Sequence, residues 1–197
     1  MATGTVNSVV FSEYELREFA IKFNDEEEGT FTHADCVGTW EDEGETLVVT
    51  KNCRGKVAKK RTTGTGSGTV TASAHWPAVL LAKMFDMERE ELAPGVQGYG
   101  RDNRHKEFTA VCKVLDEDGK VKYLAYPKMV ANTNARSIEN GGEEVSEKEI
   151  EFSYMPDDNG YGVYEALEAD LGTDTNSLKT KWMTAWEPSL MLASPAA

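Results

Sequence analysis

Residues 108–126 read FTAVCKVLDEDGKVKYLAY and give the clearest indication of secondary structure in the chain. Val111–Leu115 and Val121–Tyr126 are rich in β-branched and aromatic residues, and Asp116–Gly119 separates them. The glycine of this break can adopt the positive φ that a tight turn requires. The stretch therefore predicts a β-hairpin, and Pro127 predicts either the end of its second strand or an edge position.

Strand signals also occur on the amino-terminal side of this hairpin. In Arg17–Phe23, apolar and charged residues alternate with a period of two, which is typical of a strand with one buried face. Four further β-rich runs are separated by breaks that contain glycine or asparagine: Cys36–Trp40, Thr46–Lys51, Lys56–Thr63 and Thr69–Trp76. The segment Thr62–Thr69, TTGTGSGT, is predicted to be the flexible tip of a hairpin.

Helical signals are few. Pro77 can open one helix, because proline is accepted at the first helical position, and Pro94-Gly95 would stop it. Between them one apolar stripe contains Val79, Leu80, Met84 and Met87. A shorter helix is predicted around Val163–Leu171, with Gly172 as its carboxy-terminal cap.

These elements together predict a mainly β fold, a β-sandwich or partly closed barrel with one flanking α-helix. We expect residues 1–197 to form a single domain, with a flexible hairpin arm at about 54–69 and a flexible tail from about 188. No segment approaches the roughly 20 apolar residues that span a bilayer, and the first residues lack the features of a secretory signal. We therefore expect a protein that is made in a cytoplasm.

Charge is unevenly distributed along the chain. Its 21 Lys and Arg against 34 Asp and Glu give a net charge of −13, which disfavours a module that grips nucleic acid. Residues 13–45 and 139–170 are strongly acidic, whereas residues 51–61 contain six basic side chains and no acidic one. Such segregation is typical of solvated surface, and it would also suit identical subunits that dock through unlike edges.

No complete phosphate or metal motif is present. The glycine-rich segments 64–69 and 95–100 lack the lysine and the following helix that would cradle a phosphate. Asp116–Gly119 and Asp157–Gly160 lack the alternating ligands of a calcium loop. The three histidines and three cysteines show no metal-ligand spacing: His33, His75, His105, Cys36, Cys53 and Cys112. We predict no enzymatic activity, no metal site and no cofactor.

Residues 145–154 contain the most distinctive charge pattern of the chain. In Val145–Tyr154, the period of two places three glutamates on one face and three apolar residues on the other: Glu147, Glu149 and Glu151 against Ile150, Phe152 and Tyr154. The carboxylates would lie roughly 6.8 Å apart along the strand. A solvated sheet face explains this pattern, and so does a face whose negative field has a use, because like charges this close repel.

Three features occur in order between Trp76 and Trp186. They are the hairpin from Phe108 to Lys120 with its continuation Tyr126-Pro127-Lys128-Met129, the strand that ends Ile150-Glu151-Phe152, and Tyr161–Leu167 followed by Lys181-Trp182-Met183. Together they resemble the major tail tube proteins of long-tailed, siphovirus-type bacteriophages of Gram-positive hosts. The likeness is one of pattern, and none of the three motifs is catalytic.

The resemblance implies a β-sandwich-like virion subunit that is assembled in the host cytoplasm. Subunits of that family form rings, commonly hexameric, which stack into the hollow tail tube. The implied partners are further copies of the chain, tape-measure and tail-terminator proteins, and double-stranded DNA as a passing, non-specific cargo; no membrane is implied. An acidic lumen would hold the polyanionic duplex off the wall.

Two sets of site residues follow from this interpretation. We expect the glutamate face to lie on or near the lumen: Glu147, Glu149 and Glu151. We expect a basic set, together with the glycine-rich segment, to form a contact between subunits or rings: Lys56, Lys59, Lys60 and Arg61.

Two other interpretations stay open at this point. The chain could be a capsid decoration or adhesin-like β-sandwich whose loops bind a surface receptor. It could also be a small hydrolase whose site combines distant residues, such as His75 or His105 with an acid, and that would require a shifted pKa in a concave pocket.

Overall fold

The computed structural model describes residues 10–26, 29–34, 36–136, 138, 140–141, 145–171 and 178–192. The strands are β1 (Glu15–Phe23), β2 (Thr32–His33), β3 (Val37–Cys53), β4 (Lys56–Ala74), β5 (Phe108–Leu115), β6 (Val121–Ala131), β7 (Lys148–Met155) and β8 (Tyr164–Leu167). The helices are α1 (Ala78–Met84) and α2 (Leu178–Lys181), with 3-10 turns at Glu168–Asp170 and Pro188–Met191. None of the helices in the described part is long and apolar enough to cross a membrane.

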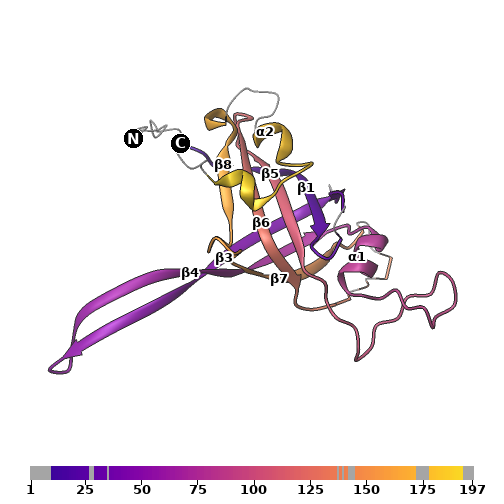
Figure 1. The fold of residues 1–197 in the computed structure, drawn as a ribbon, viewed down its shortest axis with the longest axis horizontal. Helices are drawn as coiled ribbons and strands as arrows, with labels where there is room; N and C mark the ends of the chain where they lie inside the picture. Colours follow the sequence, from indigo (N-terminus) through magenta and orange to yellow (C-terminus); the bar gives the residue numbers. More distant parts are fainter. Residues whose placement is uncertain are drawn as a thin grey trace.

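All strands belong to one antiparallel sheet (Figure 1). Its order is β2-β1-β5-β6-β7-β4-β3, and β8 pairs with the amino-terminal half of β6. The sheet curls so that Phe19 of β1 and Trp40 of β3 lie 5.2 Å apart between ring centroids, although no hydrogen-bonded ladder joins these strands among the described residues. The predicted mainly β fold with a flanking helix is confirmed, and the sheet is not closed into a barrel.

The predicted hairpin is formed by β5 and β6. Gly119 adopts a φ of 80°, and the side chain of Asp116 accepts hydrogen bonds from the backbone N–H groups of Asp118 and Lys120. Pro127 does not end the strand, because β6 continues to Ala131. The proline lies at an irregularity in the β5–β6 register, where a residue without an N–H donor can be accommodated.

The main core lies on the concave side of the sheet. Strand β7 alternates as predicted, and in β1 the predicted face of Phe19, Ile21 and Phe23 lies in this core, although Ala20 between them is buried as well. Helix α1 buries Leu80 and Met84, whereas Val79 of its predicted stripe is 63% exposed. The largest fully buried side chains of this cluster are Phe19, Ile21, Leu80, Met84, Phe85, Phe108, Tyr126, Met129, Ile150 and Phe152. Full burial of such a side chain contributes roughly 1.5–3 kcal/mol, so this cluster dominates the stability of the body.

A second apolar cluster covers the opposite side of β1, β5 and β6. Trp182, Met183 and Trp186 pack here against the buried strand residues Ala20, Val111, Tyr123 and Ala125. The indole N–H of Trp182 donates to the Leu124 carbonyl at 3.0 Å, and its ring stacks on Tyr123. The central strands are therefore buried on both faces, which explains why β5 does not alternate.

Two helix predictions need correction. Val163–Leu171 forms strand β8 and a 3-10 turn instead of a helix, because residues 122–125 of β6 offer a strand edge and Tyr164 and Ala166 face the second cluster. Gly172, the predicted cap, lies outside the described residues. The first helix ends at Met84, well before Pro94-Gly95. Residues 85–107 form a loop that the Asn103 side chain holds by donating to the carbonyls of Phe85 and Gly98.

The four predicted runs between residues 36 and 76 form only two long strands. The turn of the β3–β4 hairpin lies at Arg54-Gly55, with φ angles of 51° and 77°, so the prediction of a tip at Thr62–Thr69 is wrong. That segment lies inside β4, beside a bulge opposite residues 44–46. Gly68 is required there because a Cβ would collide with the Tyr154 ring and the Glu43 carbonyl.

The outer part of this hairpin, Thr46–Gly64, projects from the body and is called the arm (Figure 1). Every residue of the arm is exposed. At the carboxy-terminal end, where a tail was expected from about residue 188, Pro188–Met191 form a 3-10 turn, and residues 193–197 lie outside the described residues.

Candidate assembly surfaces

The acidic pattern of β7 has the predicted orientation. Ile150, Phe152 and Tyr154 are buried, whereas Glu147, Glu149 and Glu151 are exposed. On the neighbouring strand β4, Ser73 lies opposite Glu149 and Thr71 lies opposite Glu151. The glutamates therefore belong to a polar sheet face that continues beyond β7.

Strand β3 extends this face with two further glutamates. Glu41 lies opposite Thr71 and Glu43 lies opposite Thr69, so each extends a row that crosses three strands. The exposed acid face consists of Glu41, Glu43, Glu147, Glu149 and Glu151, interleaved with the hydroxyl residues Thr39, Thr69, Thr71, Ser73 and Ser153. The intervening residue Asp42 faces the core side and accepts hydrogen bonds from the hydroxyls of Tyr126 and Tyr154.

The acid face is not neutralised within the subunit. No Lys or Arg in the described ranges forms an ion pair with any of its five carboxylates. Glu151 accepts one hydrogen bond, from the amide of Asn132 at 2.6 Å. Because β3 and β7 are roughly 10 Å apart in the sheet, about one Debye length at 0.1 M salt, the fields of their carboxylates add.

The arm has the opposite charge. It holds six of the chain's 21 Lys and Arg and none of its 34 Asp and Glu, so its net charge is +6 and that of the remaining chain is −19. All four predicted contact residues lie on it, and two more join them: Lys51, Arg54, Lys56, Lys59, Lys60 and Arg61. None of the six forms an ion pair with a described carboxylate.

The arm gains little stability from its own side chains. Lys51 lies directly opposite Lys59 in the β3–β4 register, and like charges at such positions are destabilising. Leu47, Val49 and Val57 are 58–64% exposed, so their apolar surface is not buried against the body. An isolated two-stranded hairpin is marginally stable in water, and this arm is therefore suited to a contact with another molecule.

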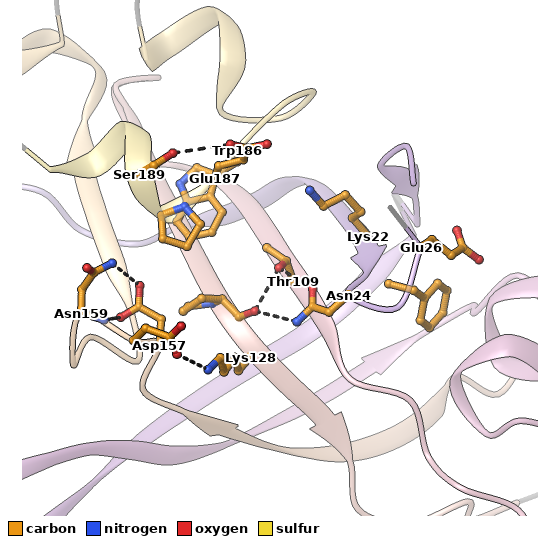
Figure 2. Close-up of a pocket in the computed structure, with 14 residues that line it drawn as sticks. Lys22, Asn24, Glu26, Thr109, Lys128, Asp157, Asn159, Trp186, Glu187 and Ser189 are labelled. Carbon is orange, nitrogen blue, oxygen red and sulfur yellow. Dashed lines mark hydrogen bonds and ion pairs between the residues drawn. The ribbon is translucent and has the colours of Figure 1, made fainter. Parts of the chain in front are cut away.

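A cavity of about 450 Å³ lies on the body between β1, β6, the turn after β7 and the carboxy-terminal segment (Figure 2). Its lining includes Thr109, whose hydroxyl hydrogen bonds with the Pro127 carbonyl and with Asn24. Trp186 also lines it, and the buried indole N–H of this residue has no acceptor among the described residues. We call this space the body cavity.

Asp157 gives the body cavity a stable negative charge. Burial alone would raise the pKa of this carboxyl, but hydrogen bonds outweigh that effect and lower its pKa below the ordinary value. The donors are the Tyr164 hydroxyl at 2.6 Å and the backbone N–H groups of Asn159 and Tyr161.

The histidines and cysteines that could take part in catalysis or metal binding make contacts that hold the fold together. No group of three or more His, Cys, Asp or Glu in the described ranges is placed to hold a metal ion. The ring nitrogens of His105 contact the Tyr99 hydroxyl and the Ala131 carbonyl, so this histidine ties the 85–107 loop to β6. Cys112 is completely buried, and burial raises the pKa of its thiol far above the ordinary value.

No protein-family model matches the chain, and no curated protein matches it. The solved structures to which the chain is similar include three at 11–13% identity. A chain of the anti-feeding prophage tube-terminating cap has a TM-score of 0.42 and 13% identity, covering 85% of this chain and 99% of that one. A chain of the anti-feeding prophage baseplate has a TM-score of 0.46 and 11% identity, covering 80% and 97%.

The third is a chain of the extended sheath–tube complex of an extracellular contractile injection system. Its TM-score is 0.40 at 11% identity, covering 78% of this chain and 90% of that one. Likenesses at these TM-scores do not establish a function.

Proposed function

We propose that this protein is a structural subunit of a phage-type tail tube, in which identical copies form rings, hexameric as in the family that the motifs resemble. The rings stack head to tail into a hollow tube through which double-stranded DNA passes. The observation that carries this proposal is the arm, a fully exposed hairpin of charge +6 on a body of charge −19. The negatively charged body of any other copy of the chain is a complementary surface for this arm.

Unlike surfaces on one subunit favour open-ended assembly. When one surface binds a different surface of the next copy, the contact is heterologous, and repetition gives a ring or a filament. Strand β3 supports lateral joining as well, since it is an edge strand of 17 residues that pairs only with β4 among the described strands. The free N–H and C=O groups of such an edge can pair with a strand of a neighbour.

The acid face suits the wall of a DNA conduit. Duplex DNA carries one negative charge per roughly 1.7 Å of its axis, so a wall without exposed cations forms no ion pairs that sliding DNA must break. We assign this wall to the predicted residues Glu147, Glu149 and Glu151 and add Glu41 and Glu43, which share their face.

The proposal places the protein in the virion tail, after assembly in the host cytoplasm, and gives it no catalytic role. The long-tailed phages of Gram-positive hosts are the source favoured by the three sequence motifs. Tape-measure and tail-terminator proteins are its proposed partners beyond further copies of the chain. A surface-binding β-sandwich would instead remain a stable monomer that binds host wall material.

Trimming the arm tests the proposal. Replacing Val48–Thr62 by Asn-Gly joins Leu47 to Thr63, which already face each other, through a two-residue turn. We expect the trimmed body to give a β-sheet circular dichroism spectrum and to keep its unfolding midpoint but to form no rods in sedimentation. A matched variant keeps the arm's length and changes Lys56, Lys59, Lys60 and Arg61 to Gln; we expect it to raise the assembly concentration about tenfold or more. Rods formed equally well by the trimmed protein would overturn the proposal.

A further inference from the structure

The end of the arm has a definite shape. Residues 53–57 form what we call the tip, in which Arg54 and Gly55 both have positive φ, as in the narrow turns that match the twist of a hairpin. Arg54 and Lys56 bring two positive charges, and Val57 is 64% exposed. A surface that binds the tip should therefore be concave, acidic at its rim and partly apolar inside.

The body cavity has these properties. The apolar part of its lining is small: Phe23, Pro127 and Trp186 are buried in the body, and Pro188 is partly exposed. Four carboxylates surround it, against two lysines: Glu26, Asp157, Asp158 and Glu187 against Lys22 and Lys128. Its volume of about 450 Å³ falls within the range of ligand pockets.

The charges around the cavity are only partly compensated within the subunit. Glu26 pairs with Lys83 at 2.9 Å. Lys128 pairs with Asp158 at 2.9 Å, but the Asp158 side chain is 96% exposed and can accept a second cation. The Glu187 carboxylate has no ion pair with a described cation, and its one hydrogen-bonding contact among the described residues is with the Ser189 hydroxyl (Figure 2). The ammonium of Lys22 lies over the Phe31 ring. The net charge of the lining is therefore negative.

We propose that the tip of one copy's arm inserts into the body cavity of the next copy. This inference rests on the proposed self-assembly and names the surface that receives the arm. Arg54 and Lys56 would meet Asp158 and Glu187 at the rim, and Val57 would lie against the partly exposed Pro188. The chain's own arm points away from its body, so the contact needs a second copy (Figure 1).

The acid face is a weaker acceptor for the tip. It has the charge, but its side chains are glutamates, threonines and serines on a pleated sheet, with no apolar hollow for Val57. Its assignment to the lumen also leaves it uncovered. The two surfaces thus have separate roles, one receiving the arm and one facing DNA.

Cross-linking to the native tip cysteine tests this inference. Cys53 is exposed at the tip, Cys36 is exposed elsewhere, and Cys112 is buried. In a C36S background, S189C places a thiol at the cavity, and E149C places one on the acid face as a matched control. Assembled protein is treated with a short bismaleimide and separated on denaturing gels. We expect a ladder of multimers from S189C, none from E149C, and none from S189C once C53S is added.

The outcomes separate this inference from the proposed function. Rods that give no ladder with S189C overturn the inference alone, and a ladder with E149C instead would assign the arm to the acid face. Protein that stays monomeric at every concentration contradicts both. N159C, tested in parallel, guards against a folding defect in S189C, since both positions line the cavity and are exposed.

Exchanging the charges of the tip and the cavity rim tests the same contact independently, through the concentration needed for assembly. D158K with E187K should raise the concentration needed for half-assembly by about tenfold, because two complementary contacts become repulsive. Adding R54E with K56E to that variant should restore assembly to within about threefold of the unaltered protein, since the signs match again. Failure of this rescue, with the folded state intact by circular dichroism, would contradict the contact.

Discussion

The body and the arm of this molecule differ in how far their side chains are buried and paired within the subunit. In the body, apolar clusters cover both sides of the central strands, and at least ten of its fifteen Lys and Arg pair with a carboxylate. In the arm, every residue is exposed and none of the six cations has such a pair in the described part. The body thus pairs most of its own cations, whereas the exposed cations of the arm have no carboxylate partner among the described residues.

This difference predicts that substitutions in the two regions affect different measurements. Trp182→Ala should have the largest effect on the body, about 3–5 kcal/mol of unfolding free energy, because it empties the second cluster and leaves the Leu124 carbonyl without its donor. Chemical denaturation followed by tryptophan fluorescence measures this loss.

Its arm counterpart is Val57→Ala, which should leave the free energy of unfolding unchanged within about 0.5 kcal/mol and weaken assembly. A destabilisation by Val57→Ala comparable to that of Trp182→Ala would show that the arm packs on its own body, and the contrast would be lost.

The glycine-rich segment of β4 runs from the body into the arm, so two glycines only four residues apart allow the two regions to be compared. Gly68→Ala should cost about 1–3 kcal/mol, because the added Cβ meets the Tyr154 ring and the Glu43 carbonyl. Gly64→Ala is the matched control, since no atom lies within 4 Å of its added Cβ. Thermal unfolding of the two variants should therefore differ clearly, and equal midpoints would contradict the described packing of β4 on Tyr154.

Asp157 predicts a smaller effect that depends on pH. Its folded pKa is lowered below the ordinary 3.8, so its contribution to stability is present above that value and is lost as the pH falls through the folded pKa. Asp157→Asn should cost about 1 kcal/mol at pH 7, because a charged acceptor of several hydrogen bonds is lost. The cost should shrink on acidification below pH 4. Urea denaturation at pH 7 and pH 3 measures both values, and a cost that grew at pH 3 would refute the assigned hydrogen bonds.

Local patterns predicted the parts of the fold in which local and tertiary signals agree. The β5–β6 hairpin, the alternation in β7 and the core face of β1 follow from a period of two and one turn glycine, whereas the burial of Ala20 on the other face of β1 does not. The predictions of secondary structure are wrong where a residue or strand far along the chain determines the conformation. The local pattern predicts Gly68 in a flexible hairpin tip, but this glycine lies in β4, where Tyr154, far along the chain, packs against it. The local pattern predicts a helix around Val163–Leu171, but β6 offers residues 164–167 a strand edge.

The candidate surfaces, like the fold, were predictable from the sequence only in part. The three glutamates of β7 and four bases of the arm were found from charge and spacing, although their roles stay proposals. Glu41 and Glu43 were missed, although the alternation in TWEDEGE places Trp40 and Asp42 on the other face. The body cavity joins residues from the two ends of the chain, such as Lys22 and Glu187, and no local pattern indicates it.

Electron microscopy of the purified protein tests the central claim most directly. Negative-stain images are taken of a fresh dilute sample and of the same sample after concentration. The account predicts rings and hollow rods of one diameter that lengthen with concentration and are absent from the arm-trimmed variant. A protein that remains monomeric in both samples, or that forms only closed dimers without a bore, would contradict it.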